Sequence, residues 1–247
     1  MDEKDIQKQL EEILSGMEDP ACLASPEAMD KLKELGLTRH DKEIPTEEVI
    51  RSRIERAALL SEQVPPVPEG LPASISFLFQ DVRECIIYGL YGAAITLSCN
   101  LIEFALKQAT FIKEAGGYRK TEPEKWDEFE DMEFGPAINR AKTAGLVTSK
   151  MSKALHEFRT DVRNPYGHYN IKKITDGTVA EDVKLIDLIT GEINTRNIDA
   201  GDNPLIQGHA KRVVDAHQVE YVFKFAYVVV VELFSRINSI DESEAED

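Results

Sequence analysis

The longest stretch without a charged residue, the eighteen positions from Cys85 to Ile102, constrains the fold of this chain most. Its length approaches that of a membrane-spanning helix. Charged residues close it on both sides, Arg83-Glu84 before it and Glu103 after it, and it contains glycines and polar residues, namely Gly89, Gly92, Thr96, Ser98 and Asn100. We therefore expect a buried helix at the centre of a bundle, and no membrane partner.

The surrounding sequence predicts further helices and a mainly α fold. One helix is expected from about Ala73 to Lys113, ended by Gly116-Gly117, because paired glycines stop helices well. Helical periodicity also predicts short helices over residues 136–144 and 148–162 and a long closing helix from about Pro204 to Ile237. We expect these helices to form a bundle over residues 73–240, followed by an acidic tail at residues 241–247.

Residues 1–63 are predicted to form an acidic helical appendage. Helices are expected at Asp5–Leu14, from Ser25-Pro26 to Gly36, and from Ile44-Pro45 onward. Four prolines follow within the nine residues 64–72, which favours a stiff linker between the appendage and the bundle.

Residues 171–203 interrupt the helical pattern. β-branched residues flank Thr190-Gly191, which is typical of a β-hairpin. We expect a small hairpin inserted into the helical domain.

Charge and cysteine content limit the function classes. A net charge of −16 argues against general affinity for nucleic acid or for an anionic membrane. The three cysteines, Cys22, Cys85 and Cys99, form no CxxC pair, which fits a reducing compartment, and no secretory signal precedes them. We expect a cytoplasmic protein. His156, His209 and His217 lack metal-ligand spacing with cysteine, so no metal or cofactor is expected.

The candidate chemistry lies at Arg163-Asn164-Pro165-Tyr166-Gly167-His168-Tyr169. Arginine grips phosphate through its planar fork, and histidine exchanges protons near neutral pH. A helix starting at Asn164-Pro165 would also point backbone N–H groups toward an anion. The alternative is a simple helix cap with a surface arginine and histidine.

The charge around this motif is opposite to that of the whole chain. Eight cationic and two anionic residues between Arg140 and Lys173 give a local net charge of +6. This basic island, whose cations are Arg140, Lys142, Lys150, Lys153, Arg159, Arg163, Lys172 and Lys173, favours a pocket for RNA or nucleotide phosphates. Chance clustering on a solvated helix face is the alternative.

The order of the helices and the motif together resemble the HEPN superfamily, the higher eukaryotes and prokaryotes nucleotide-binding domains. The HEPN signature is an arginine followed, after four to six residues, by a histidine, often with an asparagine directly after the arginine; Arg163, Asn164 and His168 fit it. The segment from Ile86 to Lys107, with Glu103, resembles the first core helix of that superfamily. The resemblance covers about residues 73–240.

The resemblance implies a metal-independent endoribonuclease of the kind found in toxin–antitoxin and anti-phage systems. His168 would act as base or acid, since an unperturbed histidine titrates near pH 6.5. Arg163 would stabilise charge on the phosphoryl oxygens, and Asn164 would cap the helix or orient either partner. Candidate substrate-binding residues are Glu103, Arg159, Tyr166, Tyr169 and Lys172. Glu103 has an equal alternative as the ion-pair partner of a core arginine such as Arg163.

One histidine cannot easily serve as both acid and base, and the resemblance implies a homodimer that would bring two motifs together. Some toxin members carry a tyrosine two residues after the histidine. Here Tyr169 follows His168 directly and Asn170 takes the later place, so regulation through such a tyrosine is not expected to carry over. The competing hypothesis is a non-catalytic HEPN-like module that binds nucleotide or a protein partner, and a third is a purely structural helical protein.

Overall fold

The computed structural model describes residues 46–187 and 189–245. The chain divides into two compact units, of which one holds residues 44–178 and 199–247 and the other includes residues 179–198. The first unit is helical and the described part of the second is a two-stranded sheet, which confirms the predicted mainly α fold with a small hairpin. The helices expected at residues 5–14 and 25–36 lie outside the described residues.

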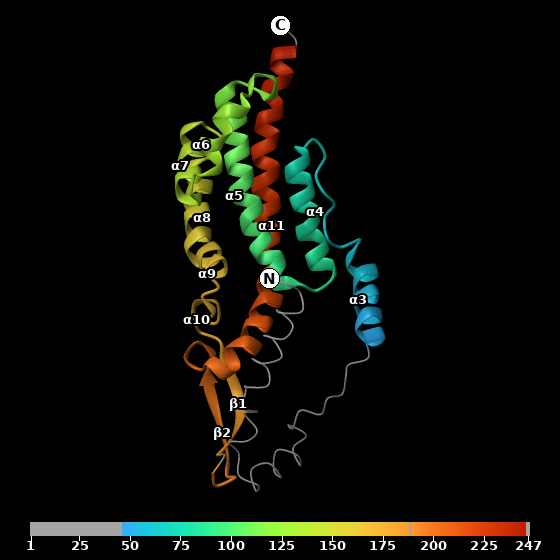
Figure 1. Ribbon diagram of the computed structural model, residues 1–247, viewed down its shortest axis with the longest axis vertical. Helices are drawn as coiled ribbons and strands as arrows, with labels where there is room; N and C mark the ends of the chain where they lie inside the picture. The colour runs from blue at the N-terminus through green and yellow to red at the C-terminus, as the bar shows by residue number, and fades with distance from the viewer. Residues whose placement is uncertain (1–45, 188, 246–247) are drawn as a thin grey trace, which may run out of the picture. The chain divides into compact units, whose positions relative to one another are not determined.

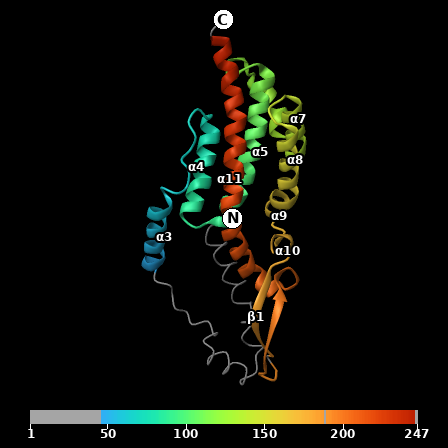
Figure 2. The same cartoon turned by 180° about the vertical axis from the view of Figure 1, so that it is seen from behind.

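Two long helices, α5 and α11, form the centre of the helical unit (Figures 1 and 2). They are flanked by α4 on one side and by α7 and α8 on the other. These helices span Ala73–Ile87 (α4), Tyr91–Ala115 (α5), Phe134–Thr143 (α7), Ser149–Phe158 (α8) and Pro204–Ala245 (α11). Their shared core consists of fully buried aliphatic and aromatic side chains, among them Ile75, Phe79, Ile95, Ile102, Leu106, Ile138, Leu155, Leu233 and Phe234.

The prediction of a single helix over residues 73–113 is wrong, because the chain turns back at Gly89. Gly89 has a left-handed φ of 74°. Its N–H donates to the Ile86 carbonyl and that of Leu90 to the Cys85 carbonyl, the paired bonds of a Schellman motif. Two helices, α4 and α5, therefore form a hairpin where one long helix was expected. The same bond pattern ends α5 at Gly116, as predicted.

The segment before α4 packs onto the same unit. Helix α3 spans Thr46–Leu60 and begins where the sequence predicted its start. In the proline-rich segment that follows, Val64 is buried and Val67 and Leu71 are half-buried against the core. The described part of the predicted appendage and the predicted linker thus both lie in the compact helical unit.

Short helical turns connect the long helices. Between α5 and α7 they are η2 (Tyr118–Lys120), η3 (Pro123–Lys125) and α6 (Trp126–Glu130). Between α8 and the hairpin they are η4 (Arg159–Arg163), α9 (Asn164–Gly167) and α10 (Ile171–Ile174), and η5 (Ala200–Asp202) precedes α11. The turns after α8 carry the Arg-His motif.

The hairpin pairs β1, Val179–Ile186, with β2, Ile193–Asp199. Its turn is held by the Asp187 carboxylate, which accepts hydrogen bonds from the backbone N–H groups of Ile189 and Thr190, each at 2.8 Å. These bonds lower the pKa of Asp187. Gly191 adopts a φ of 69° at the same turn, so the hairpin predicted around Thr190-Gly191 is confirmed.

The closing helix is longer than expected. Helix α11 continues to Ala245 and includes most of the acidic segment that was expected to follow the helix as a tail. Among the described helices, none combines the length and the apolar character needed to span a membrane.

Candidate functional site

The Arg-His motif lies in a continuous helical path and not at a new helix start. Thr148 caps α8, accepting a hydrogen bond from the Met151 N–H at 3.2 Å. The backbone then stays helical through Arg163 and Asn164. The predicted anion site at an Asn164-Pro165 helix N-terminus is therefore wrong, and Asn164 does not cap a helix.

Residues Arg159–Arg163 form a π-helical turn that ends two residues before Pro165. The Asn164 N–H donates to the Arg159 carbonyl, five residues back. Proline has no N–H and its ring clashes with the carbonyl four residues earlier, so a regular α-helix cannot continue through it unchanged. The wider π turn accommodates Pro165, and such turns are frequent at functional sites.

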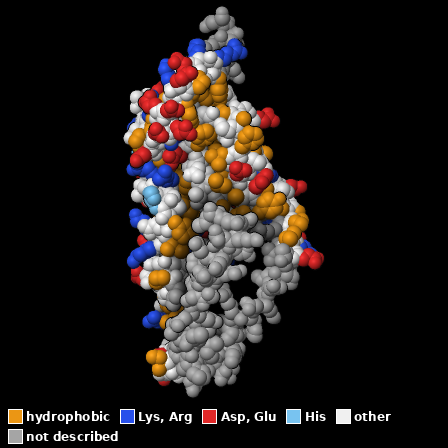
Figure 3. Space-filling model, in the orientation of Figure 1, with side chains coloured by type: hydrophobic (Ala, Val, Ile, Leu, Met, Phe, Trp, Pro, Cys, Tyr) orange, Lys and Arg blue, Asp and Glu red, His pale blue; other side chains and the backbone are white. Residues whose placement is uncertain are grey.

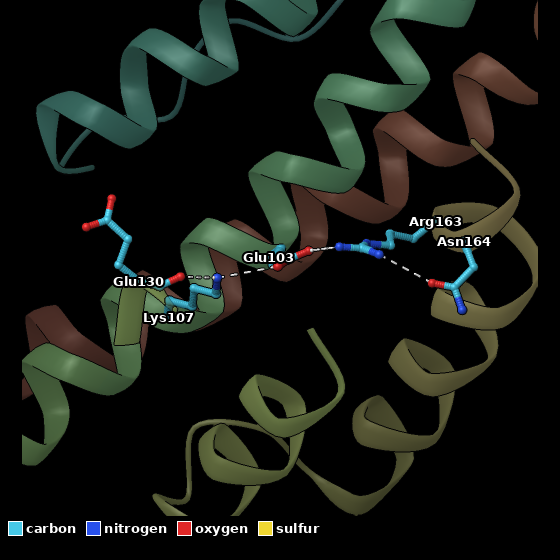
Figure 4. Close-up of polar contacts among 5 residues, drawn as sticks. All are labelled: Glu103, Lys107, Glu130, Arg163 and Asn164. Atoms are coloured by element: carbon cyan, nitrogen blue, oxygen red, sulfur yellow. Dashed lines mark hydrogen bonds and ion pairs between the residues drawn. The ribbon is translucent and has the colours of Figure 1, made fainter. Parts of the chain in front are cut away.

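Arg163 reaches across to α5 and pairs with Glu103 (Figure 4). Its Nη2 and Nε both donate to Glu103 Oε2, at 2.9 and 3.2 Å. The two side chains are only 29% and 16% exposed. Its Nη1 points to Asn164 Oδ1 at 3.4 Å, so Asn164 orients the arginine. Of the five N–H donors of the guanidinium, two make no hydrogen bond to the residues that the structure describes.

Lys107 lies one turn after Glu103 on α5 and forms a charged row with Glu103 and Arg163 (Figure 4). Its Nζ lies 3.4 Å from Glu103 Oε1 and donates to the Glu130 backbone carbonyl at 2.9 Å. The Glu130 carboxylate points away from Lys107 in this view. Two cations thus share one carboxylate, and the row keeps a net positive charge beside the motif.

His168 lies on the turn that ends α9, and its side chain is exposed. Within the described part of the chain, the imidazole makes no hydrogen bond or ion pair. A Cβ added at the preceding residue, Gly167, would lie 3.9 Å from Arg163 Nη1, so the guanidinium runs alongside the backbone that leads into His168. An accessible imidazole and a fixed guanidinium therefore lie on neighbouring turns.

Tyr166 is buried, and Tyr169 is exposed on a strained backbone. The Tyr166 hydroxyl donates to Asp215 Oδ1 of α11 at 2.6 Å. Burial, and then the bond to Asp215, raise the pKa of the Tyr166 phenol above its usual range. Tyr166 is therefore a packing residue, and its predicted contact with substrate is not favoured by this position. Tyr169 has a φ of 48° and is 68% exposed, so its ring is accessible beside His168.

Lys211 and Asp215 of α11 also belong to this region, and sequence reasoning missed them. Lys211 Nζ donates to Asp215 Oδ2 at 2.7 Å, and both side chains are less than a tenth exposed. The only available signal was the four-residue spacing of Lys and Asp, which is usually that of a surface pair.

The basic island is less positive than its sequence suggests. Glu114 and Glu128 pair with Arg140, Asp202 with Lys172 at 3.0 Å, and Glu103 with Arg163. Lys and Arg side chains are distributed along the edge formed by α8 to α10, while acidic side chains gather over α6 (Figure 3). Among the described cations of the island, no ion pair engages Lys142, Lys150, Arg159 or Lys173.

Arg159 lies over the first turn of α7. A Cβ added at Gly135 would lie 2.0 Å from Arg159 Nη1, so glycine leaves the space that the guanidinium fills. The Arg159 Nε is buried without a hydrogen-bond partner in the described residues. The structure does not bring Arg159 into the Arg163–Glu103 pair, nor does it bring Lys172 there, since Lys172 is exposed and paired with Asp202.

Three other residues of these types, His156, His217 and Cys99, do not extend the site. The His156 ring contacts Asn139 Oδ1 at 3.1 Å and the His217 ring contacts the Val213 carbonyl at 2.9 Å. Cys99 is buried beneath the motif, and burial raises the pKa of its thiol to about 12 although Arg163 acts in the opposite direction. No group of three or more His, Cys, Asp or Glu residues in the described ranges is arranged to hold a metal ion.

No protein-family model, curated protein or solved structure matches this chain significantly.

Proposed function

We propose that this chain is a metal-independent endoribonuclease of the HEPN type, acting in the cytoplasm as a toxin or as an anti-phage effector. The observation that carries the proposal is that the exposed imidazole of His168, free of hydrogen bonds within the described residues, lies one turn from the Arg163 guanidinium, which Glu103 holds in place. A preorganised cation beside an accessible proton acceptor is the arrangement that phosphodiester cleavage requires.

In the proposed reaction, the neutral imidazole of His168 removes the proton from a ribose 2′-hydroxyl. The 2′-oxygen attacks the adjacent phosphorus, and the bond from phosphorus to the 5′-oxygen breaks. The products are a 2′,3′-cyclic phosphate and a 5′-hydroxyl, which takes a proton from a general acid. The two spare N–H donors of Arg163 stabilise the charge on the phosphoryl oxygens.

The general acid is proposed to be His168 of a second copy of the chain. Neither His156 nor His217 lies in this site as a substitute, since their rings contact Asn139 and Val213. A two-fold homodimer with the turns of its two protomers across one cleft would supply both groups.

One observation favours a non-catalytic alternative, a module that binds nucleotide or a protein partner. Acidic side chains neutralise four cations of the basic island, namely Arg140, Lys153, Arg163 and Lys172. A net charge of −16 further weakens affinity for RNA. In this alternative the Arg163–Glu103 pair only stabilises the packing of α5 against the turns after α8.

A cleavage assay separates the two functions. Purified wild-type protein is incubated with end-labelled single-stranded RNA in the presence of EDTA, beside His168→Ala and the matched control His217→Ala, which removes another exposed histidine. We expect cleavage by the wild type and the control, and none by His168→Ala. Equal cleavage by His168→Ala would exclude the assignment of His168 as the acid or base.

A further inference from the structure

A buried ion pair on α11, Lys211–Asp215, contacts the two tyrosines of the motif. Lys211 and Asp215 lie one helical turn apart, with side chains 9% and 8% exposed, and their Nζ–Oδ2 distance is 2.7 Å. Charges this deeply buried are rare on a helix of a small bundle unless they are paired and hydrogen-bonded. The other polar bond of Asp215 is the one from the Tyr166 hydroxyl at 2.6 Å.

The helix α5 leaves space for this pair. A Cβ added at Gly92 would lie 2.7 Å from Asp215 Oδ2 and 3.0 Å from Lys211 Nζ. Glycine therefore allows the α5 backbone to approach the pair closely, which gives Gly92 a role beyond helix–helix packing.

Lys211 also contacts both tyrosines of the motif. Its Nζ lies 5.0 Å from the centre of the Tyr166 ring and 5.5 Å from that of Tyr169. Both distances are within the range of cation–π attraction. The two rings belong to the residues before and after Gly167-His168, so one ammonium group contacts the chain on both sides of the histidine.

The backbone of Tyr169 needs such a restraint. The N–H of Tyr169 donates to the Tyr166 carbonyl and that of Asn170 to the Pro165 carbonyl, the bond pattern of a Schellman motif. The left-handed position of this motif is usually glycine, but here it is a tyrosine with a φ of 48°. A strained residue of this kind persists only where its surroundings hold it.

We propose that Lys211 and Asp215 are positioning residues, which lock the turn that carries His168 by fixing Tyr166 below it and Tyr169 after it. They act through the tyrosines and do not touch the RNA. This inference rests on the proposed ribonuclease function for its kinetic consequence, but its structural consequence is measurable without RNA.

The test uses the double variant Lys211→Met/Asp215→Asn. Removing both charges leaves no unpaired buried ion, so the helix keeps its fold. The ammonium over both tyrosine rings is lost, and the acceptor of the Tyr166 hydroxyl becomes a neutral amide. The matched control is Lys224→Met/Glu220→Gln, which removes another Lys–acid pair at the same spacing on α11, with side chains 69% and 74% exposed. Tyr166→Phe removes only the hydroxyl and serves as the second variant if the double variant does not fold.

Two measurements are made on each variant. Amide hydrogen exchange of residues 167–170, recorded with the NMR signal of the His168 ring, reports whether the turn is held. We expect exchange at least tenfold faster than in the wild type and a broadened or displaced ring signal, with neither change in the control. In RNA cleavage we expect kcat to fall at least tenfold at an unchanged KM, since the restraint aligns the imidazole and does not bind substrate.

The two claims fail separately. If the wild type does not cleave RNA, the proposed function is wrong, and the exchange measurement still decides whether Lys211 and Asp215 hold the turn. Unchanged exchange and ring signal at residues 167–170 in a folded double variant would overturn the positioning role. Unchanged values in Tyr166→Phe would overturn the part of it that acts through the hydrogen bond from Tyr166 to Asp215. A raised KM at constant kcat would also overturn it, by assigning the pair to substrate binding.

Discussion

Replacing Glu103 by glutamine probes the contact that holds Arg163. The carboxylate accepts two hydrogen bonds from Arg163, at 2.9 and 3.2 Å, and lies 3.4 Å from Lys107 Nζ. Glutamine keeps the shape and one acceptor oxygen but removes the charge that both cations share. Arg163 and Lys107 are then left without an anionic partner in a half-buried site.

The expected loss lies between two known limits. Exposed ion pairs contribute about 0–1 kcal/mol, whereas removing one partner of a fully buried pair costs about 3–5 kcal/mol. Because Glu103 is 16% exposed and Arg163 29%, we expect the free energy of unfolding to fall by about 2 kcal/mol. Urea unfolding followed by far-ultraviolet circular dichroism measures this loss.

Glu157→Gln is the matched control. It breaks the Lys153–Glu157 pair, which spans 3.7 Å with side chains 81% and 62% exposed. We expect it to change the free energy of unfolding by less than about 0.5 kcal/mol. If Glu103→Gln costs no more than Glu157→Gln, the Arg163–Glu103 pair does not form in solution as the structure describes it.

Two further predictions concern stability. Gly89→Ala should lower the free energy of unfolding by about 1–2 kcal/mol, because φ is 74° at that residue. The control Gly208→Ala lies in a helix where an added Cβ meets nothing within 4 Å, so it should raise the free energy of unfolding by about 0.5–1 kcal/mol. If both substitutions shift the urea midpoint in the same direction, the turn at Gly89 is refuted. Burial raises the pKa of Cys99 from 9.0 to about 12, so the unfolded chain loses this proton first, and the stability present below pH 9 should fall as pH rises toward 12. Cys99→Ala should remove that part of the slope, and parallel curves for the two proteins would contradict it.

The sequence predicted the fold class because the local signals were strong. The glycine pair ends α5 at Gly116, and α8 starts after its cap, Thr148. The β-branched residues around Thr190-Gly191 indicated the hairpin. The turn at Gly89 was missed because the apolar residues on both sides share one helical pattern. Gly89 was placed inside one long predicted helix, although its positive φ ends a helix.

Of the candidate site, the motif residues Arg163 and His168 could be proposed from the sequence because they lie five positions apart. The ion pair of Glu103 with Arg163 was one of two alternatives for that glutamate, and it forms in the structure. Lys211 and Asp215 could not be predicted, since only the packing of α11 against the turns after α8 makes a Lys–Asp pair at that spacing buried. The π turn before Pro165 was likewise missed, because Asn164-Pro165 was taken as the start of a new helix.

The identity of the RNA ends tests the proposed chemistry most directly. The wild-type protein and His168→Ala are each incubated with labelled RNA in EDTA, and the termini of the fragments are analysed by mass spectrometry. The proposal predicts 2′,3′-cyclic phosphate and 5′-hydroxyl ends from the wild type and intact RNA with His168→Ala. Intact RNA with both proteins, or fragments carrying 5′-phosphate ends that persist in His168→Ala, would contradict it.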